Sequence, residues 1–185
     1  MKNNYDYIDL DYIYTDPKTG ILRNKENITD IEVLLAFESL KVSEKLELLQ
    51  ENPIKIKNSN TLLEIHKFLF QDVYEWAGKV RIVEISKDGK GFLPTSRFDT
   101  CFAHIDSLLE EYRKILTDDK IKIAHKLAEI LDALNYLHPF REGNGRSQRE
   151  FIRTLSLEKG IELHLNPPNN KDVYERYMNG TQWRC

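Results

Sequence analysis

Apolar residues recur every three or four positions along most of this chain, and this spacing predicts amphipathic helices. The stretch 120–137 carries apolar residues on more than one stripe, so we expect it to be the central, buried helix. Thr29 is the candidate cap of the first helix, because Glu32 follows three residues later. Gly78 and Gly160 stand where helices should end. The expected helices run from about Thr29 onward, from Asn60 or Thr61 to about Trp76, from Asp99 to Leu116, from Lys120 to Leu137, from about Gly145 to Lys159 and over residues 171–178.

Two stretches break the helical pattern. Residues 44–58 are mixed in character, are interrupted by Pro53 and carry no predicted element. Residues 81–85 alternate apolar and polar side chains, and a turn at 88–91 follows, which predicts a short β-hairpin. A single hairpin cannot build a sheet core, so we expect it to lie on a helical body as a flap.

Together these elements predict an all-α fold, a compact bundle of about six or more helices with one short β-hairpin flap. The length of 185 residues suits one domain, and 41% hydrophobic with 31% charged residues is ordinary globular composition. We therefore expect a single domain over residues 1–185, with a core of about 10–165 and a short C-terminal helical extension of about 166–185.

Charge and cysteine content exclude several classes of protein. A net charge of −3 gives no bulk electrostatic reason to bind nucleic acid or an anionic membrane directly. Cys101 and Cys185 form no CxxC pair, which argues against a structural zinc site or a disulfide framework. The first residues lack the order of a secretory signal, and the longest apolar run near the start is far too short for a membrane span. These features favour a soluble, cytoplasmic protein.

The densest chemistry lies between the last two strong helices, in the 138–146 loop. Gly143 and Gly145 allow positive φ, so that successive N–H groups can point toward an anion. This arrangement opens into a helix N-terminus, which favours phosphate. Arg146 and Arg149 share a face of the first helical turn, where two cations oppose the helix dipole unless a polyanion lies between them. The pattern predicts a phosphate-binding site.

Two further side chains of the 138–146 loop suit transfer chemistry. Glu142 is a carboxylate able to hold a Mg²⁺ ion that also contacts phosphate oxygens. His138 has a side chain whose unperturbed pKa suits proton abstraction near neutral pH. A phosphate site, a metal carboxylate and a base together indicate phosphoryl or nucleotidyl transfer to a hydroxyl. The other histidines are expected to be structural: His66, His104, His125 and His164.

At these residues the chain resembles the Fic family, whose signature His-Pro-Phe-x-(Asp/Glu)-Gly-Asn-Gly-Arg-x-x-Arg is intact over residues 138–149. The segments 14–20, 69–78 and 135–137 also resemble the family's pattern. The resemblance covers most of residues 10–165, and its signature is long and chemically varied.

The resemblance implies a protein adenylyltransferase, a nucleotidyltransferase that moves AMP from Mg-ATP to a Tyr, Ser or Thr hydroxyl of a target protein. By position, His138 would deprotonate the hydroxyl and Glu142 would hold Mg²⁺. Asn144, with the loop amides of Gly143 and Gly145, would hold the α-phosphate. Arg146 would hold the β- and γ-phosphates, and Arg149 would anchor the γ-phosphate.

The resemblance also assigns the flap, at about residues 83–97, to the target protein. An added β-strand would align the target there, because main-chain pairing fixes the register of an extended segment with little demand on its sequence. The expected docking residues are Ile85, Ser86, Lys87, Asp88, Gly89, Lys90, Gly91 and Phe92.

Many relatives carry a self-inhibiting helix with the pattern (Ser/Thr)-x-x-x-Glu-(Gly/Asn), whose Glu pairs with the second Arg of the signature. The pattern is absent here, and its nearest match, residues 43–47, is followed by Leu48. The chain would then leave Arg149 uncovered. We therefore expect the toxin of a toxin–antitoxin pair, silenced by a small helical antitoxin that supplies the Glu. Related toxins point to a type II topoisomerase subunit as the target.

Two other functions fit the same residues. One is a nucleotide-binding regulatory module without turnover, although such a module needs neither the base His138 nor the metal carboxylate Glu142. The other is transfer of a different nucleotide or phosphate-bearing group, because the pocket for the base is not legible in the sequence.

Overall fold

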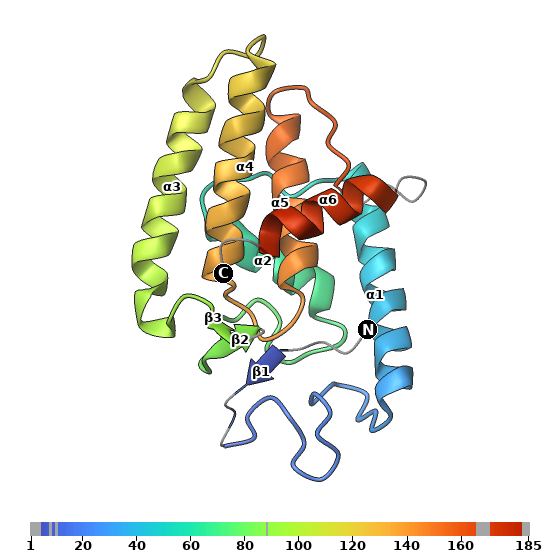
Figure 1. Ribbon diagram of the computed structural model, residues 1–185. Coiled ribbons are helices and arrows are strands. Elements are labelled where there is room, and N and C mark those ends of the chain that lie inside the picture. The colour runs from blue at the N-terminus through green and yellow to red at the C-terminus, as the bar shows by residue number, and fades with distance from the viewer. Residues whose placement is uncertain (1–4, 8, 10, 88, 166–170, 183–185) are drawn as a thin grey trace.

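The computed structural model describes residues 5–7, 9, 11–87, 89–165 and 171–182. Six helices account for most of these residues, as predicted, and a short sheet lies at one end of the bundle (Figure 1). The helices are α1 Ile31–Glu51, α2 Thr61–Phe70, α3 Phe98–Lys114, α4 Lys120–Leu137, α5 Asn144–Leu157 and α6 Lys171–Gln182. The strands are β1 Tyr5–Tyr7, β2 Ile85–Lys87 and β3 Lys90–Gly91, and a 3-10 turn, Thr95–Arg97, precedes α3.

Helix α4 lies between α3 and α5, while α2 packs against α5 and α1 (Figure 1). Ile130, Leu134 and Leu137 of α4 are fully buried, so this helix supplies the middle of the core. Because α4 is central, its C-terminal end and the 138–146 loop that follows lie within the bundle, at the end that carries the short sheet (Figure 1). No helix among the described residues combines the length and apolarity that crossing a membrane requires.

Helix α1 differs from its prediction at both ends. Its N-cap is Asp30 and not Thr29, because the Asp30 carboxylate accepts hydrogen bonds from the N–H groups of Glu32 and Val33. The helix also continues through most of the stretch that carried no predicted element. Val42 and Leu49 extend one buried stripe across it, and the helix ends shortly before Pro53.

Helix α2 ends at Phe70, earlier than the predicted Trp76. The next residues turn back along α2, and Gly78 takes a φ of +78°. A Cβ atom on Gly78 would lie 2.6 Å from Cβ of Lys67, so only glycine fits this return. Gly78 is therefore a close-approach point and not the end of a longer helix.

The sheet holds one strand more than the single predicted hairpin. Strands β2 and β3 form the flap, and β1 pairs antiparallel with β2, so that β2 is central. Strand β1 has three residues, too few for a readable alternation, and its partner lies about 80 residues along the chain. The alternating segment also becomes a strand only from Ile85, because Arg81 is drawn into the bundle and is 1% exposed.

Candidate active site

Two residues of the 138–146 loop take the left-handed conformation and bound its non-helical part, because α5 begins at Asn144. His138 caps α4 with a φ of +40°, and Gly143 precedes α5 with a φ of +82°. A Cβ atom on Gly143 would lie 2.4 Å from the Phe70 ring, so glycine is required for contact with α2 as well as for φ. Gly145 was also expected at positive φ, but it lies within the first turn of α5 and is helical.

Asn144 closes the loop on itself. Its side-chain oxygen accepts from the N–H of Phe140 at 2.9 Å, and its side-chain nitrogen donates to the carbonyl of Phe140 at 2.8 Å. Asn144 is 4% exposed, and Phe140 is fully buried. This side chain therefore braces the loop, and the contribution of Asn144 to a phosphate site falls to its backbone N–H at the start of α5.

His66 of α2 contacts the 138–146 loop and holds its backbone in place. Its Nδ1 accepts from the N–H of Gly78 at 2.8 Å, so the neutral ring carries its proton on Nε2 and donates to the carbonyl of Glu142 at 3.0 Å. The ring stacks on Phe140 at 3.7 Å. Burial lowers the pKa of His66 to about 3, which keeps the ring neutral. His66 is structural, as predicted, and the structure shows that it holds the carbonyl of a candidate site residue.

His138 lies beneath the flap. Its ring stacks on Phe92 at 3.7 Å, and the residue is 7% exposed. Burial lowers the pKa of His138 to about 3, a hydrogen bond with the backbone of Asn135 opposes this shift, and the charges of Arg81 and Lys87 add to it. The imidazole is therefore neutral at neutral pH, which is the state that can accept a proton.

Arg81 joins the flap to the loop, a role that was not predicted from the sequence. Its guanidinium donates to the carbonyls of His138 at 2.9 Å, Val83 at 2.6 Å and Leu93 at 2.6 Å. Its own N–H donates to the carbonyl of Pro139 at 2.7 Å. The sequence did contain one clue to this burial. Arg81 lies two residues before Val83, so both side chains point to the same side of the alternating segment, and Val83 is buried.

Arg146 already has anionic partners within the chain. One guanidinium nitrogen lies 2.6 Å from Glu38 Oε1, and the other lies 3.5 Å from Glu142 Oε1. The guanidinium also lies over the Phe70 ring at 4.7 Å. The expectation that this cation would need a bound polyanion is therefore wrong for Arg146. Glu38 was missed because it stands on α1, more than 100 residues before Arg146.

Arg149 is covered by α6. Its guanidinium carbon lies 5.8 Å from the ring centroid of Tyr174 and 5.7 Å from that of Tyr177, within the range of cation–π attraction. Burial raises the pKa of Tyr177, and the charge of Arg149 opposes that shift. Arg149 was expected to be uncovered by this chain, and these two contacts correct that expectation. The rings belong to α6, a helix that lies within the predicted C-terminal extension of about 166–185.

The flap meets the loop through Phe92, while its outer edge is partly occupied. Strand β1 pairs along β2, with Asp6 opposite Ser86. Within the described part of the sheet, β3 (Lys90–Gly91) is therefore the open edge of the flap, and β1 forms the opposite edge of the sheet. Asp88, one of the predicted docking residues, lies outside the described residues.

Glu142 is the candidate metal carboxylate. Its side chain is 29% exposed, and Oε1 accepts from the N–H of Gly143 at 3.0 Å. No group of three or more metal-ligating side chains gathers among the described residues. A single half-buried carboxylate suits Mg²⁺, which usually takes one or two carboxylates and completes its shell with phosphate oxygens and water.

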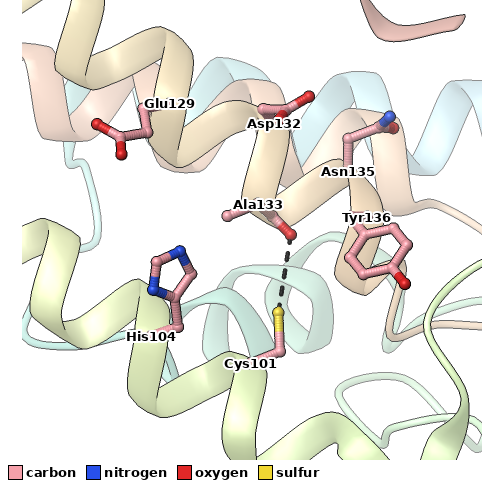
Figure 2. Close-up of a pocket in the computed structure, with 7 residues that line it drawn as sticks. All are labelled: Cys101, His104, Glu129, Asp132, Ala133, Asn135 and Tyr136. Carbon is pink, nitrogen blue, oxygen red and sulfur yellow. Dashed lines mark hydrogen bonds between the residues drawn. The ribbon is translucent and has the colours of Figure 1, made fainter. Parts of the chain in front are cut away.

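Two sizeable hollows lie elsewhere on the bundle. One, of about 480 Å³, is lined mainly by apolar residues of α4, α5 and the segment 159–165. The other, of about 410 Å³, lies between α3 and α4, and Figure 2 shows Cys101 and His104 of α3 facing Glu129 and Asp132 of α4. Neither of these two hollows is lined by the 138–146 loop, and convergent chemistry locates the candidate site.

The chain is similar to several known proteins. The model of the Fic/DOC family matches residues 56–156. The protein adenylyltransferase VbhT of Bartonella schoenbuchensis is 37% identical over 151 residues, which cover 81% of this chain and 32% of that protein. The probable protein adenylyltransferase y4lH of Sinorhizobium fredii is 32% identical over 179 residues, 89% of this chain and 86% of that protein.

Solved structures share the fold. BepC of Bartonella tribocorum, solved with bound AMPPNP, superposes with a TM-score of 0.79 at 22% identity, covering 93% of this chain and 90% of that chain. The chain thus spans about a third of VbhT and most of y4lH.

Proposed function

Because this chain belongs to the Fic/DOC family, we propose that it is a protein adenylyltransferase, which moves AMP from ATP to a hydroxyl of another protein and releases pyrophosphate. The observation that carries the proposal is the 138–146 loop. It brings a neutral imidazole, a carboxylate and a helix N-terminus together, with Arg146 and Arg149 on the following turn. Relatives named protein adenylyltransferase support the same activity.

The proposed reaction uses these groups in one displacement. His138 accepts the proton of the incoming Tyr, Ser or Thr hydroxyl, and the hydroxyl oxygen forms a bond to the α-phosphorus. The bond between the α-phosphorus and the bridging oxygen to the β-phosphate breaks, and pyrophosphate leaves. Backbone N–H groups of Asn144 and Gly145, in the first turn of α5, hold the α-phosphate, because the N–H of Gly143 is already donated to Glu142. Arg146 and Arg149 neutralise the β- and γ-phosphates.

Mg²⁺ fits the proposed site through Glu142. The bound ion would supply positive charge to the phosphates during transfer. Glu142 already contacts Arg146 and the N–H of Gly143, so its carboxylate is oriented before nucleotide binds.

The flap is the proposed docking element for the target protein. A target segment would pair with the outer edge of β3 or replace β1 beside β2. Phe92 stacks on His138, so the flap sets how a hydroxyl reaches the imidazole.

We further propose a role as the toxin of a toxin–antitoxin pair, with a type II topoisomerase subunit as target. A small helical antitoxin would bring a Glu to Arg149, next to Tyr174 and Tyr177 of α6. Mass spectrometry of proteins modified after expression of wild type and His138→Ala identifies the target.

The central test is His138→Ala. We expect this variant to lose AMP incorporation from labelled ATP and to keep ATP binding, because the base is lost while the phosphate contacts remain. Arg149→Ala should weaken ATP binding more than target recognition. Unchanged incorporation by His138→Ala contradicts the mechanism. ATP binding without any incorporation by wild type favours a regulatory module instead.

A further inference from the structure

A buried carboxylate stands on α1, outside the residues that match the family model. The side chain of Glu38 is 5% exposed, and Oε1 lies 2.6 Å from Nη1 of Arg146. Its other oxygen, Oε2, accepts a short hydrogen bond from the hydroxyl of Tyr74. Both carboxylate oxygens are therefore engaged, one by an arginine of the candidate site and one by a tyrosine behind it.

Packing alone gives no reason for a charge at this position. Glu38 lies on the buried stripe of α1, between Leu34 and Val42. An apolar residue would fill such a place without the desolvation penalty that a buried carboxylate carries. Removing one partner of a buried pair is costly, whereas an apolar replacement of the whole pair is often neutral. The position of Glu38 therefore points to a use for its charge.

That use is visible in the surroundings of Arg146. The side chain of Arg146 is 25% exposed, so part of the guanidinium faces the site. Glu38 holds one nitrogen, Glu142 lies 3.5 Å from the other, and the Phe70 ring lies under the plane. A guanidinium has five N–H donors, so these contacts leave donors for a ligand. A long arginine otherwise loses rotamer freedom when it binds, which weakens binding.

We propose that Glu38 is a positioning residue, which holds Arg146 toward the polyphosphate of the nucleotide, and that Tyr74 holds Glu38. The inference rests on the proposed adenylyltransferase function and adds a part of the site that the signature does not contain. Burial and the Glu38 charge raise the pKa of the Tyr74 hydroxyl, so this group remains a proton donor.

The opposite reading is that Glu38 competes with phosphate for Arg146 and so inhibits. The burial of the two groups argues against it. Glu38 is nearly inaccessible, whereas Arg146 reaches the solvent, so phosphate can approach Arg146 without displacing the carboxylate. If Glu38 positions Arg146, removing its charge should lower activity and nucleotide affinity. If Glu38 competes with phosphate, removing its charge should raise both.

Glu38→Gln removes the charge with little change of shape. We expect a roughly tenfold or greater loss of kcat/KM for ATP, mainly through KM, and a comparable loss of AMPPNP affinity in calorimetry, because Arg146 loses its orientation. Tyr74→Phe should cause a smaller loss of the same kind. Glu44→Gln, an exposed residue of the same helix, is the matched control and should leave both quantities unchanged.

A double-mutant cycle separates positioning from general damage. In an Arg146→Ala background, Glu38→Gln should have little further effect, because Glu38 acts through Arg146. A full additional loss in that background, or a gain of activity by Glu38→Gln alone, overturns the inference. AMPPNP affinity is measured without turnover. Failure of the proposed function, seen as absent incorporation by wild type, therefore remains distinguishable from failure of this inference.

Discussion

The guanidinium of Arg81 donates a hydrogen bond to the main-chain carbonyl of His138 over 2.9 Å, across 57 residues of sequence. The same guanidinium binds the carbonyls of Val83 and Leu93, which stand at the two ends of the flap. One side chain therefore sets the position of the flap relative to the candidate base. Flap and loop should respond together to any change at Arg81.

Arg81→Lys should cost about 2 to 4 kcal/mol of unfolding free energy. Lysine keeps the charge but cannot reach three carbonyls with a planar fork, and each buried carbonyl left without a donor costs about 1 to 3 kcal/mol. Urea denaturation measures the loss. The exposed Arg97→Lys is the control, with a change within about 0.5 kcal/mol. Equal effects of the two substitutions would show that Arg81 does not hold the flap against the 138–146 loop.

Gly143→Ala should be more damaging than an alanine that only has to adopt a positive φ. Its Cβ would lie 2.4 Å from the Phe70 ring, while a Cβ on Gly160, at a φ of +68°, has nothing within 4 Å. Gly160→Ala should therefore cost only about 1 to 2 kcal/mol in urea denaturation. Gly143→Ala should exceed this cost and abolish AMP incorporation. If both variants behave alike, the contact with Phe70 does not matter.

Acid should destabilise the fold through His66 and His138. Burial lowers the pKa of both to about 3, whereas the unfolded chain titrates near pH 6.5. Between these values the unfolded state binds more protons. Unfolding free energy should therefore fall as the pH drops below about 6.5, by up to about 1.4 kcal/mol per pH unit for each histidine.

Urea denaturation at several pH values checks this slope. His66→Gln should make the slope shallower by about one proton, while the exposed His125→Gln should leave it unchanged. If the unfolding free energy of His66→Gln depends on pH as steeply as that of the wild type, the lowered pKa of His66 is wrong.

Removing residues 1–7 should expose the flap edge that β1 covers. Ser86 and Lys87 pair with β1, so backbone amides of β2 should exchange faster with deuterium in the truncated chain. Amides of α5 should keep their protection, which makes them the internal control. Unchanged exchange in β2 would mean that β1 does not protect the flap in solution.

Local patterns explain what the sequence could predict. The helices follow from apolar spacing, and the loop chemistry follows from residue types within a dozen positions, as with His138 and Glu142. Even the cap at Asp30 lies one residue from its predicted place, because short-range hydrogen bonds decide it.

The missed contacts around the candidate site and the sheet all join distant segments. Glu38 reaches Arg146 from α1, Arg81 reaches His138 from the flap, and β1 pairs with β2 from the start of the chain. Such contacts depend on how helices pack, which no window of sequence records. The contact of Arg149 with Tyr174 and Tyr177 of α6 also depends on how the helices pack.

The approach of Gly143 to the Phe70 ring has an evolutionary consequence. A side chain at position 143 becomes tolerable only where the ring at position 70 has become smaller. The Arg146 guanidinium lies over the same ring. A smaller side chain at position 70 would therefore also remove a contact that holds Arg146 in place. Across related chains, positions 70, 143 and 146 should therefore change together or not at all, which a covariation count can reveal.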